Sequence, residues 1–282
     1  MKRLILLVSI LVCPLVQAQQ VSFNAISPKV GQTFVHTSTY KMDVDVVLKF
    51  AGELYQEHND VTTITIRKAE TVLEANGDAI TKLKVLYELI DRKTVITEDK
   101  IPENKKTEPS PVLGRTYVVS VQNGAIKVTD GHGLKPSNDE IEIVQDDYEG
   151  LGKSDSFLQL FRNKSIQPGE RVQMPGALAE GIFTDAEHRQ VKVDNATFVL
   201  KNVRQNAAIF DTALKMQWNQ DANTSVKMNV TGETLVSIQN SRMLSSTLSG
   251  TVRVTGAEQI YDRLVMVDGK GKISITETLQ TR

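Results

Sequence analysis

Side chains that could perform chemistry are few and widely spaced in this chain of 282 residues. The histidines are His36, His58, His132 and His188, and none lies within metal-ligand spacing of another. The sequence contains neither a nucleophile elbow nor a phosphate-binding glycine loop. The single cysteine, Cys13, falls in a segment that we expect to be removed, which excludes thiol catalysis, disulfides and cysteine metal sites from the mature chain. We therefore expect a protein that is not an enzyme, with no catalytic residue, metal or cofactor.

One cluster of acidic residues could take part in binding, namely Asp146, Asp147 and Glu149. It crowds the C-terminal end of an expected helix, where the macrodipole already makes negative charge unfavourable. The cluster could bind a cation or a basic partner, or it could be a solvated helix end relieved by Lys153 or Arg162. We favour the solvated helix end, and we expect it to be the weakest part of the helix.

The helix in question lies in segment 137–162, the only segment with a convincing helical pattern. Ser137 followed by Glu140 is a capping box, which predicts the start of the helix. Apolar side chains then recur at helical spacing and form one stripe, namely Ile141, Val144, Tyr148 and Leu151. An apolar stripe needs a surface that covers it, so we expect these four residues to face a sheet. They are our candidate ligand-binding residues.

The end of this segment is marked by a second set of signals. Gly150 can end the helix, and Ser154 can cap a further short turn. That turn would carry Phe157, Leu158 and Phe161.

Strand patterns fill most of the remaining sequence. Every even position from 40 to 50 is apolar, and most of the odd neighbours are polar. This period of two is typical of a strand with one buried face and one wet face. Asn76-Gly77 and Asn123-Gly124 each lie between two such runs and predict β-hairpins.

These patterns predict a mainly β fold. We expect a large curved antiparallel sheet, or two sheets, or an open half-barrel, wrapped on one short amphipathic helical segment. Residues 19–282 would form a single β-rich domain. Its two sheet-forming halves, about 29–135 and 165–280, would be joined by the helical segment 137–162.

The N-terminal residues have the pattern of a secretory signal peptide, residues 1–18. Lys2 and Arg3 precede an apolar run that is too short to span a membrane, and Ala18 is the expected last residue before cleavage. Lipidation of Cys13 is the alternative, but Val12 stands where that processing wants a small residue. No later segment is apolar enough to be transmembrane, so we expect an exported protein of the periplasm or the extracellular space.

The net charge and the composition limit the classes of partner that we expect. Removal of the signal peptide changes the formal net charge from −1 to −3. So mild a charge does not suggest a nucleic acid or an anionic membrane as partner. A cysteine-free exported chain points to a bacterial envelope.

The order of features resembles that of bacterial secreted, periplasmic proteins of unknown function, built as long antiparallel sheets with a helical insertion. The features are a first strand led by Gly31, the Asn76-Gly77 hairpin, segment 137–162, the run Pro168-Gly169-Glu170-Arg171-Val172 and the meander from Thr231 to Gly256. This resemblance implies no catalytic residues. More loosely, the layout is similar to periplasmic lipoprotein carriers, in which an open β half-barrel wraps a helix and holds acyl chains.

Three classes of function remain. The protein could carry an apolar, lipid-like ligand between helix and sheet, which the apolar stripes favour. It could instead be an envelope structural or protein-interaction module without a small ligand, which the lack of chemical motifs favours. An enzyme of unrecognised type is the third class. A ligand-sized cavity would favour the carrier, and a tight cluster of titratable groups in a cleft would revive the enzyme.

Overall fold

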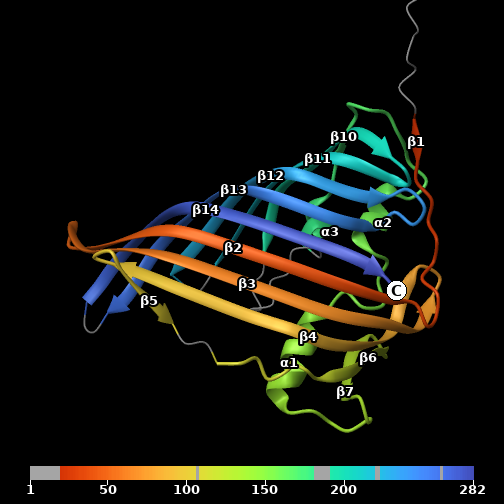
Figure 1. Ribbon diagram of the computed structural model, residues 1–282, viewed down its shortest axis with the longest axis horizontal. Helices are drawn as coiled ribbons and strands as arrows, with labels where there is room; N and C mark the ends of the chain where they lie inside the picture. The colour runs from red at the N-terminus through yellow and green to blue at the C-terminus, as the bar shows by residue number, and fades with distance from the viewer. Residues whose placement is uncertain (1–19, 106–107, 181–190, 220–222, 261–262) are drawn as a thin grey trace, which may run out of the picture.

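The computed structural model describes residues 20–105, 108–180, 191–219, 223–260 and 263–282. Almost all strands of this part of the chain belong to one antiparallel sheet of 12 strands, and the helices are short (Figure 1). The two edge strands of that sheet do not pair with each other in the described residues, so the sheet is open. The predicted fold class is confirmed. The expected signal peptide, Cys13 and His188 lie outside the described residues.

The strands range in length from two to 24 residues. The strands are β1 (Val21–Ser22), β2 (Thr33–Phe50), β3 (Glu53–Asn76), β4 (Ala79–Glu98), β5 (Ile101–Lys105), β6 (Thr116–Gln122), β7 (Ala125–Asp130), β8 (Ser165–Ile166), β9 (Arg171–Gln173), β10 (Lys192–Arg204), β11 (Ala207–Asn219), β12 (Thr224–Ser237), β13 (Met243–Ile260) and β14 (Arg263–Thr281). The helices are α1 (Asn138–Asp147), α2 (Ser156–Phe161) and α3 (Gly176–Glu180).

The sheet joins the two halves of the chain through the pairing of β2 with β14. Its order is β7-β6-β4-β3-β2-β14-β13-β12-β11-β10-β9, with β5 on β4, while β1 and β8 form a small separate sheet. Across the joint, Tyr40 pairs with Ile275 and Val44 with Gly271. The strands of the two expected halves therefore continue one another in a single sheet.

Both predicted hairpins occur, with one difference in detail. Asn123 and Gly124 form the two-residue loop between β6 and β7, and both have positive φ, as a type I′ turn requires. In the other hairpin Asn76 still pairs with Ala79, so its loop is Gly77-Asp78. Gly77 alone supplies the positive φ there.

One face of the sheet packs on α1 and α2; we call it the inner face. On β2 it carries the even positions, with Val44 and Leu48 buried and Tyr40, Met42 and Val46 half-buried. The opposite, outer face of β2 carries charged residues, namely Lys41, Asp43, Asp45 and Lys49. The predicted wet and dry faces are confirmed.

Close strand contacts require glycine at two inner-face positions. A Cβ atom on Gly250 of β13 would collide with the carbonyl oxygen of Asn229 on β12. One on Gly271 of β14 would collide in the same way with Asp43 of β2. These glycines let neighbouring backbones approach, which suits the strong curvature of the sheet in Figure 1.

Two hydrophobic cores lie on the inner face. The larger one packs Phe157, Leu160 and Phe161 of α2 against β2 and β10–β14. The smaller one packs α1 against β4, β6 and β7. Both helices lie toward the end of the sheet where β2 begins and β14 ends (Figure 1).

The helix boundaries differ from the predicted ones. The capping box of Ser137 and Glu140 is present as predicted. However, α1 ends at Asp147 with Tyr148 as its C-cap, two residues before Gly150. The N-cap of α2 is Asp155, whose carboxylate accepts from the backbone N–H of Leu158 at 3.0 Å, so Ser154 does not have the expected role. A carboxylate accepts a backbone hydrogen bond at this position as readily as a hydroxyl.

Candidate functional site

The predicted apolar stripe of α1 does face the sheet. Val144 is fully buried and Tyr148 is 7 % exposed, and both belong to the smaller core. Ile141 and Leu151 are half-buried and pack against the same core. The structure thus brings the four predicted site residues together on one side of the α1 region. Side chains of β4, β6 and β7 pack against that side. That they touch a ligand stays a prediction.

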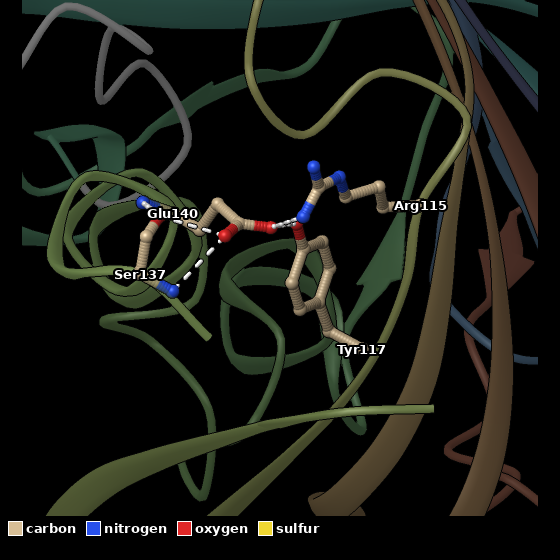
Figure 2. A network of polar contacts seen from close by, with 4 residues as sticks. All are labelled: Arg115, Tyr117, Ser137 and Glu140. Carbon is tan, nitrogen blue, oxygen red and sulfur yellow. Dashed lines mark hydrogen bonds and ion pairs between the residues drawn. The ribbon is translucent and has the colours of Figure 1, made fainter. Parts of the chain in front are cut away.

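The N-terminus of α1 is fixed to β6 by the carboxylate of Glu140, which is 5 % exposed (Figure 2). Its Oε1 accepts from Arg115 at 2.6 Å and from the Tyr117 hydroxyl at 2.5 Å. Its Oε2 accepts from the Ser137 backbone N–H at 3.0 Å and from the Ser137 hydroxyl at 2.6 Å. Burial alone would raise the pKa of Glu140, but these hydrogen bonds and the Arg115 charge lower it to about 2.

The C-terminus of α1 is tied to β3 and β4. Asp147 accepts from the Lys68 ammonium at 3.2 Å and from the Tyr87 hydroxyl at 2.7 Å. The expectation that Lys153 or Arg162 relieves this acidic end was wrong for Asp147. Arg162 instead pairs with Asp78 at 2.6 Å. The true partner stands on a strand far away in the sequence, so helix spacing could not reveal it.

Lys68 and Glu70, two residues further on, both point to the inner face and form one half-buried polar cluster with α1. Glu70 accepts from the Tyr148 hydroxyl at 2.7 Å and pairs with His36 Nε2 at 3.1 Å. The Lys68 ammonium lies 5.2 Å from the centre of the Tyr148 ring. We call these residues, with Asp147, the Lys68 cluster.

Neighbouring groups favour the charged forms of Lys68 and Glu70 despite their burial. Burial would lower the pKa of Lys68, but Asp147 and Glu70 outweigh it and raise that pKa. Burial would likewise raise the pKa of Glu70, yet His36, Lys68 and the Tyr148 hydroxyl lower it to about 2. The cluster is therefore an ion pair network whose charges support one another.

A cavity of about 420 Å³ adjoins this cluster. His36 and Glu277 line it from the sheet, Lys153 and Phe157 from the region of α2, and Arg242 from the segment before β13. Its size falls within the range of roughly 300–1,000 Å³ that small-ligand pockets occupy. The four predicted residues of α1 do not line it, although their neighbours Glu149 and Gly150 do.

Two polar groups of the cavity are affected by burial. Glu277 accepts from the Tyr40 hydroxyl at 2.8 Å, and burial raises its pKa. The guanidinium of Arg242 lies 4.4 Å from the centre of the Phe34 ring, and burial lowers its pKa. The cavity therefore combines a desolvated cation with a carboxyl group that resists ionisation.

The histidines do not form a shared site in the described part of the chain. His58 Nε2 lies 3.6 Å from Asp60 on β3, and His58 precedes Lys68 on that strand by ten residues. His132 is exposed in a turn, where its backbone N–H donates to Asp130 at 2.9 Å. No three metal-binding side chains gather within the residues that the structure describes.

Sequence reasoning missed Lys68, Glu70, Arg242 and Glu277. A signal existed for the first two, because Ile64, Ile66, Lys68, Glu70 and Val72 occupy successive inward positions of one strand. Charged residues in a row that is otherwise apolar indicate a buried polar site. Arg242 follows a strand in a loop and gave no such signal.

Comparisons with known proteins leave the fold as the firmest description of the chain. No family model matches it and no curated protein matches it. A lipovitellin structure that addresses lipid–protein interactions is similar at 9 % identity and a TM-score of 0.41; the match covers 89 % of this chain and 26 % of that one. The chain thus spans about a quarter of that protein.

Two bacterial structures are more distant. An outer membrane channel from Pseudomonas putida F1 matches at 10 % identity and a TM-score of 0.22, over 92 % of this chain and 98 % of the channel. A FadL homologue from Pseudomonas aeruginosa matches at 6 % identity and a TM-score of 0.15, over 88 % and 90 %. Likenesses at these scores carry no argument about function. Within the described residues, no helix combines the length and apolarity needed to cross a bilayer.

Proposed function

We propose that this protein binds or carries an apolar, lipid-like ligand on the inner face of its open sheet, outside the cytoplasm and without catalysing a reaction. The main observation behind this proposal is a row of apolar side chains that are only half-buried on the inner face of β2–β4. They are Met42, Val46, Ile64, Ile66, Ile90 and Ile96.

The inner face is more completely buried in the other half of the sheet. The inner faces of β11 and β12 are covered, with Leu214, Met216, Val226, Met228 and Val230 all buried. The strands β2–β4 continue the same apolar surface through the pairing of β2 with β14. A partly exposed apolar surface that continues a core is a natural site for an apolar ligand.

The outer face suits water. It carries threonine and charged residues along β2, β3 and β13, and Arg67 of β3 pairs with Glu88 of β4 at 2.7 Å. The inner face of β2–β4 is thus the more apolar of the two, although Val47, Val61 and Val95 lie on the outer face. The export signal expected at residues 1–18 supports a place in the bacterial envelope.

The test uses an uncharged, fluorescent naphthylamine dye. We expect the purified protein to bind it, and Ile66→Ser to weaken binding several-fold because an apolar contact is lost. Val61→Ser is the matched control, since Val61 is half-buried on the same strand but at an outer position. Absence of dye binding by the wild type, or equal losses in both variants, would contradict the proposal.

A further inference from the structure

Arg242 is held in place by its backbone rather than by an ion pair. Its carbonyl oxygen accepts from the Ser237 N–H at 2.9 Å, and its own N–H donates to Asn240 at 3.2 Å. The preceding Ser241 is fully buried and donates its hydroxyl to the carbonyl oxygen of Asn24 at 2.6 Å. This loop is therefore fixed, and the start of the Arg242 side chain with it.

The guanidinium has donors to spare. It stacks on Phe34, and its side chain makes no hydrogen bond or ion pair with any residue in the described part of the chain. Arginine offers five N–H donors in a rigid fork that matches carboxylate and phosphate groups. Cations withdrawn from water are normally paired, because an unpaired buried charge is costly. The carboxylates of Asp155 and Glu70 act on Arg242 electrostatically, but within the described residues neither accepts a hydrogen bond from it, so its N–H donors are available to an anion.

The carboxylates of the same cavity do not fill this role. Asp155 caps α2, and Glu277 receives the hydroxyl of Tyr40. Glu149 also lines the cavity and has a contact of its own. On the cationic side, Lys153 faces the same space. The cavity can therefore still donate hydrogen bonds to a ligand.

The rest of the lining is apolar. Phe157, Leu178, Met243 and Leu279 all border the cavity. Phe157 is also a member of the larger core, and Leu178 and Met243 pack against that core. A ligand that satisfies both parts of the lining needs an anionic end and an apolar chain.

We propose that this cavity binds the anionic head group, a carboxylate or phosphate, of an amphiphile, with Arg242 as its principal donor. The inference rests on the proposed function, because it names the chemical class of the ligand that the inner face would hold. Lys153 would add positive charge at the rim.

The experiment compares ligands that differ only in the head group. A long-chain fatty acid with a fluorophore at its tail, its methyl ester and the alkyl phosphate of equal chain length are titrated into the full-length protein. We expect the acid or the phosphate to bind at least about tenfold more tightly than the ester, as charged hydrogen bonds allow. A preference for one of these two anions identifies the head group.

Variants then assign the preference to Arg242. Arg242→Met should weaken binding of the preferred anion by about tenfold to a hundredfold and leave the ester unchanged. Arg242→Lys should retain part of the preference, and it tests the inference independently if the methionine variant folds poorly. Arg162→Met is the matched control, because Arg162 is paired with Asp78 outside the cavity. It should change nothing.

The outcomes separate this inference from the proposed function. Equal binding of acid, phosphate and ester by the wild type would overturn the inference and support an apolar site without head-group recognition. An anion preference that survives in both Arg242 variants would overturn the role of Arg242. Failure of all three ligands and of the naphthylamine dye would overturn the proposed function as well.

Discussion

Two cations lie over aromatic rings at the same end of the sheet, and the fold treats them differently. Lys68 lies 5.2 Å from the Tyr148 ring centre and pairs with Asp147 at 3.2 Å. Arg242 lies 4.4 Å from the Phe34 ring centre, with no carboxylate in ion-pair distance among the described residues. A fold that used both cations for stability would pair both. The difference teaches that Lys68 ties α1 to the sheet through an ion pair, whereas Arg242 makes no such tie within the described residues, which is why we propose it as a ligand donor.

The Lys68 cluster and the surroundings of Arg242 are connected through paired residues of β2 and β3. Phe34, which supports Arg242, is the register partner of Glu70 in the Lys68 cluster. Glu70 in turn holds His36, which lines the cavity. Damage to the Lys68 cluster should therefore disturb the cavity, while damage to Arg242 should leave the cluster intact. The predictions test this asymmetry, beginning with the largest effect.

Detachment of α1 from the sheet would disrupt the Lys68 cluster. Val144 is fully buried, so Val144→Asp places an unpaired carboxylate in the smaller core. We expect a loss of about 4 kcal/mol in the free energy of unfolding, measured by urea denaturation. Glu142→Ala on the exposed side of α1 is the control and should change little. Wild-type stability in Val144→Asp would show that α1 does not pack as described.

Removal of the paired cation should cost somewhat less. Lys68→Met leaves Asp147 buried without its ion partner, although both side chains keep some exposure, 18 % and 16 %. We expect a loss of about 3 kcal/mol, again from urea denaturation. Lys93→Met is the matched control, since Lys93 forms an exposed pair with Asp91 and its loss should change stability little. Equal effects of the two variants would mean that the Lys68 cluster behaves as a surface site.

Acid should weaken both anchors of α1. The pKa values of Glu70 and Glu140 are lowered to about 2 in the folded protein, below the ordinary value of 4.5. Their stabilisation is therefore complete above about pH 5 and is lost as the pH falls toward 2. Glu277 has a raised pKa and acts in the opposite direction, losing its contribution as the pH rises.

The measurement is urea denaturation at several pH values between about 5 and 2.5. We expect Glu140→Gln, which keeps an oxygen acceptor for Tyr117, to reduce the fall in stability over this range by about 2 kcal/mol. Asp139→Asn is the control, because Asp139 is exposed one residue away. A fall as steep in Glu140→Gln as in the wild type would place the acid sensitivity elsewhere.

Sequence reasoning recovered the parts of the fold that local patterns encode. The alternation from Tyr40 to Phe50 gave a strand with the correct inner face, and Ser137 with Glu140 gave the start of α1. Each depends on residues within one strand or one helical turn. The pairing of β2 with β14 joins residues more than two hundred positions apart, and no local pattern encodes it.

The candidate site was largely hidden for the same reason. The stripe of Val144 and Tyr148 was recognised, but its cover was unknown until β4, β6 and β7 were in place. Asp147 was assigned to solvent because its cation, Lys68, is brought to it only by the sheet. The polar pattern of β3 could have revealed Lys68 and Glu70 as inward charges. Their partners still required the fold.

The smallest expected effect on stability is that of Arg242→Met. The variant loses a cation–π contact with Phe34, worth about 0.5–1 kcal/mol. It also removes a guanidinium that burial disfavours more strongly than Asp155 and Glu70 favour it. The methionine side chain can still cover the Phe34 ring. The free energy of unfolding should therefore change by less than about 0.5 kcal/mol in the absence of ligand. With the anionic amphiphile present, the wild type should gain stability in proportion to the logarithm of ligand concentration, and the variant should gain much less. Thermal unfolding with and without ligand measures both quantities. A loss above about 2 kcal/mol without ligand would show that Arg242 is a structural cation like Lys68, and the contrast between the two regions would disappear.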